Sequence, residues 1–166
     1  MHRRAFLLLA SASLVAAPAL AAAKKPVPAP APASAKPEDV VRNLYARLDA
    51  EAYDYMTNRK LAQRYFTAST VKLIDKVDAK SKKLQEPGID YDPLIDGQDG
   101  EVKGLAVTVE SATADRATVV AAFTSFDEKL RVTFDMQLEK GAWRVEDIRG
   151  REGSSLKAVA ADYLKD

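Results

Sequence analysis

Apolar and polar side chains alternate without a break through the stretch Leu130-Arg131-Val132-Thr133-Phe134-Asp135-Met136-Gln137-Leu138-Glu139. A repeat of two residues is typical of a β-strand with one buried face and one exposed face. The same repeat occurs at 105–110. The stretch 117–125 is rich in small and β-branched residues, and Trp143 and Val145 are expected to point inward from a fourth strand that ends near Arg149. We therefore predict four consecutive strands in an antiparallel sheet with one covered side.

Before Gly104 the hydrophobic repeat lengthens to three or four residues, which indicates helices. Pro37 suits the first position of a helix, and its acidic neighbours suit the first turn, so we expect a helix to about residue 50. Further helices are expected at 58–66, after a cap at Thr67, and from residue 154 or 155 to 164. The prediction is an α+β fold in which N-terminal helices pack on one face of a curved four-stranded antiparallel sheet and a short C-terminal helix follows.

The N-terminus has the three parts of a secretory signal peptide. Two arginines supply the basic part, the apolar run 5–20 follows, and three alanines supply the small residues at the cleavage site. We expect cleavage after Ala21 or Ala23, and therefore a signal peptide at residues 1–23 and a periplasmic or secreted mature protein. The alternative is an uncleaved membrane anchor, which Pro18 and the alanine-rich end disfavour.

Two export routes are open for this signal. The segment Arg3-Arg4-Ala5-Phe6-Leu7 resembles the twin-arginine motif, and Lys24 and Lys25 beside the cleavage site fit that route. Leu8 stands where the twin-arginine motif has a polar residue, and ordinary signals also begin with arginines. Both routes deliver the protein to the periplasm or beyond.

Proline recurs at every second position from Pro26 to Pro32 and again at Pro37. Proline has no backbone N–H donor and favours an extended polyproline helix. We therefore predict a Pro/Ala-rich spacer at residues 24–37 and one α+β domain at residues 38–166. The spacer is interpreted either as a stalk or as a disordered leader.

The charges of the chain are nearly balanced. Removal of residues 1–23 takes away Arg3 and Arg4 and no acidic residue, which changes 25 basic and 24 acidic residues to 23 and 24 and the net charge to −1. Such a balance gives no electrostatic argument for nucleic acid or an anionic membrane as a partner. The one basic cluster, Lys80, Lys82 and Lys83, is expected on the solvent face of a helix.

The mature chain would contain neither cysteine nor histidine, because the sequence has no cysteine and its one histidine is His2. This composition excludes disulfides, a lipid-modified cysteine, Ser-His-Asp and Cys-His nucleophiles and conventional zinc sites. We expect no cofactor, and no stable membrane anchor after cleavage.

Five acidic residues fall within the loop 90–101. Oxygen-rich loops bind Ca²⁺, so Asp92, Asp96 and Asp99 are candidate ligands. The spacing does not match an EF-hand, because Leu94 falls at the third position. The favoured interpretation is that these side chains stabilise turns by bonding to nearby backbone.

Three segments carry a resemblance to a known family: Arg64-Tyr65-Phe66-Thr67 with Leu73, Asp92-Pro93-Leu94-Ile95-Asp96-Gly97-Gln98-Asp99, and Gly141-Ala142-Trp143-Arg144-Val145-Glu146-Asp147-Ile148. Through them the region 38–165 resembles an uncharacterised family of small bacterial periplasmic proteins and lipoproteins. That family is similar in turn to the nuclear transport factor 2-like superfamily, which implies a cone-like sheet wrapped around helices. The resemblance marks Asp92, Gln98 and Asp99 as site candidates. The chain departs from the lipoprotein members because it lacks their lipobox cysteine.

Asp147 follows Trp143 by four residues and Val145 by two, so strand alternation predicts all three on the covered face. A carboxyl group in an apolar cone has a raised pKa, as a general base requires. Superfamily relatives with ketosteroid isomerase and dehydratase activity use an aspartate and tyrosines in that cavity, which implies Tyr45, Tyr65 and Tyr91 as companions. The alternative is a solvated Asp147 paired with Arg149 or Arg144.

Two functions follow from these observations. The favoured hypothesis is a noncatalytic exported module that binds a small ligand or an envelope protein, with candidate residues Tyr65, Tyr91, Asp92, Gln98, Asp99 and Trp143. For Trp143 itself, a place in the core is the favoured interpretation over a ligand platform. The alternative is a cofactorless isomerase or dehydratase with Asp147 as its general base.

Overall fold

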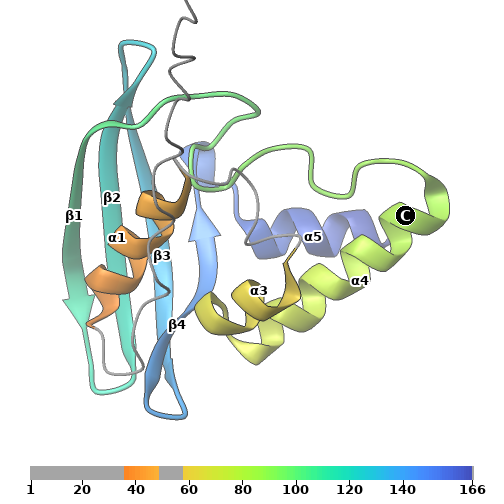
Figure 1. Cartoon of the computed structure of the whole chain (residues 1–166), viewed down its shortest axis with the longest axis horizontal. Coiled ribbons are helices and arrows are strands. Elements are labelled where there is room, and N and C mark those ends of the chain that lie inside the picture. Colours follow the sequence, from red (N-terminus) through yellow and green to blue (C-terminus); the bar gives the residue numbers. More distant parts are fainter. Residues whose placement is uncertain (1–35, 49–57, 166) are drawn as a thin grey trace, which may run out of the picture.

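In the described part of the chain, helices come first, a four-stranded sheet follows them, and one further helix follows the sheet (Figure 1). The computed structural model describes residues 36–48 and 58–165. The predicted signal peptide and residues 24–35 of the predicted spacer lie outside these ranges. The elements are α1 (Pro37–Leu48), α3 (Arg59–Tyr65), α4 (Ala68–Leu84), β1 (Lys103–Ala112), β2 (Arg116–Ser125), β3 (Glu128–Glu139), β4 (Ala142–Arg149), a 3₁₀ turn η1 (Arg151–Gly153) and α5 (Leu156–Lys165).

The sheet is an antiparallel meander with the strand order β1-β2-β3-β4. Val119 of β2, Phe134 of β3 and Ile148 of β4 are aligned across it, and all three are buried. Lys140 and Gly141 form the tight turn between β3 and β4 with φ angles of 53° and 77°. Positive φ at both central residues is the geometry that two-residue hairpins prefer. The predicted α+β fold with an antiparallel sheet is therefore confirmed.

Side-chain caps start the helices where the sequence predicted them. The Asn58 side chain accepts hydrogen bonds from the backbone N–H groups of Lys60 and Leu61 at the start of α3. Thr67 accepts one from Thr70 N at the start of α4. Such acceptors satisfy donors that the first helical turn leaves without a partner.

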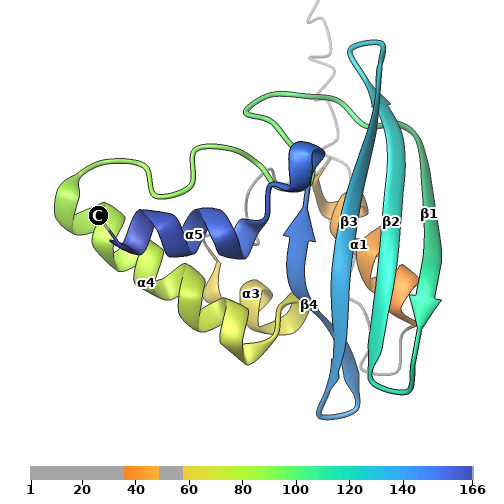
Figure 2. The ribbon, with the colours of Figure 1, turned by 180° about the vertical axis from the view of Figure 1, so that it is seen from behind.

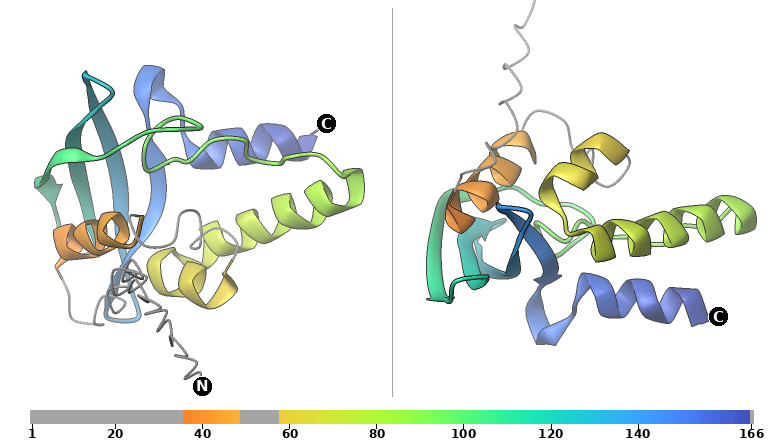
Figure 3. Two further views of the ribbon diagram at one scale, coloured as in Figure 1. Left: turned by 45° about the horizontal axis from the view of Figure 1, so that its top comes forward. Right: turned by 90° about the horizontal axis from the view of Figure 1, so that it is seen from below.

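Helix α1 lies across the concave face of the sheet (Figures 1 and 3). The ring of Tyr45 packs against Phe123 and Phe134, with ring centroids 5.6 and 6.0 Å apart. The Tyr45 hydroxyl donates a hydrogen bond to the Leu94 carbonyl at 2.8 Å, which ties the loop before β1 to this core. Apolar side chains of α1 and the sheet thus share one core.

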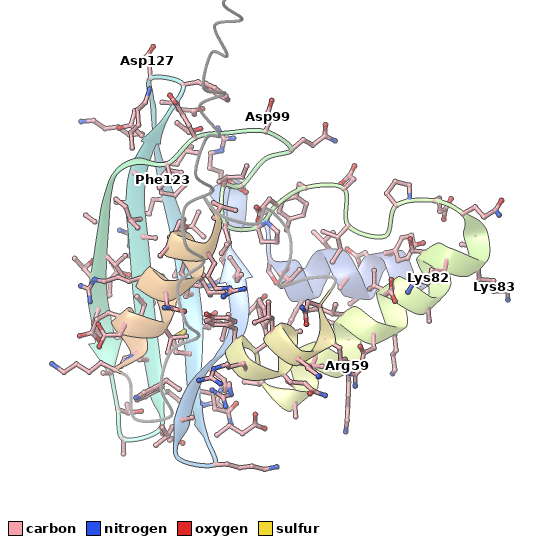
Figure 4. The ribbon with its side chains drawn as sticks, in the orientation of Figure 1. Arg59, Lys82, Lys83, Asp99, Phe123 and Asp127 are labelled. Carbon is pink, nitrogen blue, oxygen red and sulfur yellow. The ribbon has the colours of Figure 1, made fainter. Side chains whose placement is uncertain are left out.

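Helices α4 and α5 pack side by side and extend away from β4 (Figures 2 and 3). Lys80 of α4 lies over the ring of Tyr163 in α5, 4.8 Å from its centroid, and donates to the Tyr163 carbonyl at 2.6 Å. Lys82 and Lys83 are exposed on the far end of α4 (Figure 4), as expected for a solvent face. Within the described ranges, no helix has both the length and the apolar character needed to cross a membrane.

Candidate functional site

A β-bulge in β4 changes which way its acidic side chains point. Asp147 pairs with Asp135 of β3, whereas Val145 already pairs with the next residue, Met136, so Glu146 is an extra residue in β4. A bulge of this kind breaks the strict alternation of faces. Val145 and Ile148 are both buried, and Asp147 lies opposite them on the outer face. The prediction that Asp147 shares the covered face with Trp143 and Val145 is therefore wrong.

The Glu146 carboxylate joins the starts of α4 and α5. It accepts hydrogen bonds from the hydroxyls of Thr67 at 2.5 Å and Ser69 at 3.1 Å, and it forms an ion pair with Lys157. Burial by itself would raise the pKa of Glu146, but the hydrogen bonds from Lys157 and Thr67 and the charge of Lys157 hold it below its ordinary value. Glu146 is thus held in its charged form by three side chains.

Asp147 serves the first turn of α5. Its Oδ2 accepts a hydrogen bond from the Ser155 hydroxyl at 2.6 Å, and its Oδ1 accepts one from the backbone N–H of Lys157 at 3.0 Å. A carboxylate at a helix N-terminus also interacts favourably with the helix dipole. Arg149 pairs with Asp135 instead, through two hydrogen bonds of 2.9 and 2.7 Å. The predicted pairing of Asp147 with Arg149 or Arg144 is replaced by this capping role.

Asp147 also borders an open groove of about 450 Å³ on the outer face of the sheet, which we call the outer groove. Its polar lining is Ser111, Thr113, Arg116, Thr118, Asp135, Glu146, Asp147 and Lys157. The three acids in this lining already bond to Arg149, Lys157 or Ser155. The outer groove therefore carries charges of both signs, and its acidic side chains already have partners within the protein.

The acidic loop uses its candidate calcium ligands in turns and ion pairs. Asp92 is buried, and its Oδ1 accepts from Leu94 N at 2.9 Å while its own N–H donates to Gly97 O. Asp96 accepts from Arg151 N at 2.7 Å, and Asp99 accepts from Gly100 N at 3.1 Å. Among the residues that the structure describes, no three acidic or histidine side chains converge as metal ligands would. This geometry favours the turn interpretation of the loop.

The other ligand candidates do not gather at one place. Tyr65 is buried at the end of α3 and donates its hydroxyl to Asn43, and Trp143 is half-buried against the core. Gln98 is exposed. Tyr91 is half-buried, and burial raises its pKa, with further contributions from the negative charges of Asp96, Asp147 and Asp90. The structure thus brings Tyr91 near Asp147 and leaves Tyr65 in the core.

A second groove, of about 420 Å³, lies between the α3–α4 corner and the hairpin of β3 and β4. We call it the basic groove, because four of its nine lining side chains are cationic. These cations are Arg59, Lys72, Lys140 and Arg144, and the other lining residues are Gln63, Phe66, Ala68, Val71 and Glu139. Arg59 lies at the start of α3 and pairs with Asp75 in the middle of α4, away from Lys82 and Lys83 at the far end of that helix (Figure 4). Three separate segments therefore contribute positive charge to one site.

The cations of the basic groove are only partly neutralised by the protein. Arg59 forms an ion pair with Asp75 of α4. The Glu139 carboxylate accepts a hydrogen bond from Ala68 N at 3.1 Å. Neither Lys72 nor Lys140 forms an ion pair with any residue in the ranges 36–48 and 58–165.

Arg144 is half-buried in the lining of the basic groove. Burial lowers the pKa of its guanidinium, the charge of Glu139 opposes this, and the like charge of Arg64 lowers it further. Arg144 shares the lining of the basic groove with Lys72 and Lys140. Three cationic side chains around one groove can bind a negatively charged group.

Sequence analysis missed the basic groove. Its cations come from positions 59, 72, 140 and 144, and no motif or repeat in the sequence links these four positions. The balanced total charge also conceals a local excess. The local excess of positive charge becomes visible only in the fold, where the α3–α4 corner packs beside the β3–β4 hairpin.

Comparisons with known proteins add little to this description. No protein family matches the chain, and no curated protein matches it. Among solved structures, a phospholipid-binding protein from Ralstonia solanacearum, in complex with a phospholipid, matches with 13% sequence identity and a TM-score of 0.37. The match covers 75% of this chain and 71% of that chain. A similarity at this level assigns no function to the chain.

Proposed function

We propose that this chain is an exported, noncatalytic module that binds a small anionic ligand in the basic groove. The observation that carries the proposal is the local excess of cations, with Lys72 and Lys140 unneutralised within the described residues and Arg144 partly desolvated. Like charges held together are unfavourable unless a counter-charge joins them. A bound anion supplies that counter-charge, so the groove is better suited to an anion than to the apolar ligand of a closed cone.

The size of the basic groove agrees with a small ligand. Its volume of about 420 Å³ falls in the range of roughly 300–1,000 Å³ that small-molecule sites occupy. Uncharged lining from Phe66, Ala68 and Val71 lies beside the cations. Sites with a few placed polar groups next to apolar lining typically orient one end of a ligand.

The environment of Asp147 supports a module without catalysis. A general base must lie within hydrogen-bond reach of the proton that it removes. Both carboxylate oxygens of Asp147 already accept hydrogen bonds from the start of α5, and the side chain lies on the outer face of the sheet rather than among Tyr45, Phe123 and Phe134. These contacts are those of a capping residue.

The binding proposal is tested by a titration of the ¹⁵N-labelled protein with citrate, acetate, sulfate and inorganic phosphate. At least one of these anions should shift the backbone amide signals of Ala68, Lys72 and residues 139–144. The variants Lys72→Gln and Arg144→Gln should each weaken that binding about tenfold, which corresponds to about 1.4 kcal/mol. Two variants are used so that a loss of folding in one does not decide the result.

Lys82→Gln is the matched control, because it removes one positive charge from the exposed far end of α4 (Figure 4). Its affinity for the anion should equal that of the unchanged protein. Equal losses in Lys82→Gln and Lys72→Gln would mean that the anion responds only to net charge. That result, or unmoved amide signals around the groove with every anion, would refute the proposal.

Export is the other half of the proposal and rests on the N-terminal sequence. N-terminal sequencing of protein recovered from the periplasm should begin at Ala22 or Lys24. A protein that begins at Met1 would show that the signal peptide is not cleaved.

A further inference from the structure

The charge balance of the basic groove indicates how many negative charges its ligand carries. The lining residues carry four positive charges and the negative charge of Glu139, and Asp75 pairs with Arg59 from outside the lining. Arg64 is not part of the lining and is not counted, so the lining keeps a surplus of two positive charges. A monocarboxylate would neutralise half of that surplus. A phosphate monoester carries a charge of about −1.5 to −2 near pH 7 and would neutralise nearly all of it.

The types and positions of the cations agree with a phosphoryl group. Arg144 offers a planar fork of N–H donors, and Lys72 and Lys140 offer compact ammonium groups. Lys72 comes from α4, whereas Lys140 and Arg144 come from the β3–β4 hairpin, so donors line the groove on two sides. A tetrahedral group that presents three terminal oxygens can accept from both sides at once, which a planar carboxylate does less well.

We infer that the ligand of the basic groove is a phosphate monoester, an inference that rests on the anion-binding function proposed above. The groove, at about 420 Å³, reaches the size of sites that hold whole small organic molecules. Phe66 and Val71 of its lining are buried in the core, so the exposed Gln63 and Ala68 provide the place for the organic group of the ester. A monoester should therefore bind more tightly than inorganic phosphate.

Titration calorimetry with three probes tests the ligand class: phenyl phosphate, benzoate and inorganic phosphate. Phenyl phosphate and benzoate share the ring and differ in the charge and shape of the anionic group. We expect phenyl phosphate to bind at least tenfold more tightly than benzoate, and several-fold more tightly than inorganic phosphate. Equal affinities for phenyl phosphate and benzoate would overturn the inference.

The pH dependence of binding provides a second measurement. The second pKa of a phosphate monoester is about 6, so acidification to about pH 5 converts most of the dianion to the monoanion. Phenyl phosphate should then bind several-fold more weakly, whereas sulfate, used as the control, keeps its charge of two. If phenyl phosphate and sulfate respond equally to pH, the protein titrates rather than the ligand, and the inference fails.

The double variant Lys72→Gln/Lys140→Gln removes the surplus of two charges that the inference depends on. It should bind phenyl phosphate and benzoate with similar, weak affinities, while Lys82→Gln should keep the preference of the unchanged protein. If the double variant still bound phenyl phosphate more tightly than benzoate, another surface would be responsible for phosphate recognition, and the inference would be wrong.

The two proposals fail in different ways. If benzoate, sulfate and phenyl phosphate all bind the groove equally well, anion binding stands and the phosphate monoester is wrong. If no probe shifts the groove amides, both are wrong. Flotation with phosphatidylcholine vesicles, with and without phosphatidic acid, identifies the source of the group. Recovery only with phosphatidic acid indicates a lipid headgroup, and phenyl phosphate binding without flotation indicates a free metabolite.

Discussion

The Oδ1 atom of Asp147 lies 3.0 Å from the backbone nitrogen of Lys157 and accepts its hydrogen bond, although the two residues belong to β4 and α5. The neighbouring Glu146 bonds to Thr67 and Ser69 at the start of α4. Two adjacent acids in one strand therefore hold the starts of two helices. The bulge in β4 makes this arrangement possible, because it lets consecutive side chains reach different elements.

Asp147→Ala should destabilise the protein by about 1–2 kcal/mol, since the change removes a capping acceptor and leaves the Ser155 hydroxyl without it. Urea unfolding followed by circular dichroism measures the loss. Asp162→Ala is the control, because Asp162 is exposed and, within the described residues, pairs only with Lys165 at the end of α5. The control should change stability by less than about 0.5 kcal/mol. Similar values for both variants would contradict the capping role.

Gly150→Ala should destabilise the protein by about 1–3 kcal/mol, because a Cβ at this position would overlap the Asp96 carboxylate. That carboxylate is held in place by Arg151 N and the Arg151 guanidinium. Thermal unfolding provides the measurement. Gly97→Ala, in the same loop region, is the matched control, since its Cβ would meet atoms no closer than 3.5 Å. Adding Asp96→Ala should restore part of the loss in Gly150→Ala, and an unchanged loss would rule out the overlap.

The Glu146 carboxyl predicts a loss of stability in acid. Its pKa in the folded protein is below the ordinary value of 4.5, so the unfolded chain takes up this proton at higher pH than the folded one. The stabilisation is therefore complete above pH 4.5 and is lost as the pH falls through the lower, folded pKa. Urea unfolding between about pH 3 and pH 6 should show this loss, and Glu146→Gln should show less of it.

Ser69→Ala completes that pH experiment. It removes one hydrogen-bond donor from Glu146 and leaves Thr67 and Lys157 in place. The acid-dependent loss in Ser69→Ala should fall between that of the unchanged protein and that of Glu146→Gln. An unchanged pH dependence in Glu146→Gln would show that other groups cause the acid sensitivity.

Tyr45→Phe should cost about 1–2 kcal/mol, because it leaves the buried Leu94 carbonyl without its hydrogen bond. Tyr91→Phe is the comparison, since the Tyr91 hydroxyl makes no hydrogen bond within the described residues. Equilibrium unfolding of both variants separates the two cases. A loss in Tyr91→Phe as large as in Tyr45→Phe would contradict the assignment.

Most of the fold could be predicted from the sequence, because a helix or strand with one buried face spaces its apolar residues at a characteristic interval. Phe134 and Met136 are buried as the alternation in β3 requires, and Thr67 caps α4. The edge strand is less clear, because Val107 is buried whereas Val109 of the same expected face is 39% exposed. The bulge at Glu146 could not be predicted, since an inserted residue leaves no mark on composition and reverses the faces that follow it.

The candidate site could be predicted far less well. Sequence reasoning selected the acidic loop, whose Asp92 and Asp96 bond within the protein, and Asp147, which caps a helix. The cations of the basic groove escaped notice because Arg59 and Arg144 are far apart in sequence and no periodic pattern links them. A site built by the packing of distant segments depends on tertiary contacts that local patterns do not encode.

The meander order β1-β2-β3-β4 means that each strand pairs with its neighbour in sequence. Helix α4, by contrast, packs against α5, although all four strands lie between these helices in the sequence. A chain that emerges N-terminus first can therefore complete its sheet as soon as Arg149 is available. The side of α4 that α5 covers stays in water until residues 156–165 have been made, because α5 is its packing partner. The order of synthesis thus makes the two-helix extension the last part of the domain to assemble.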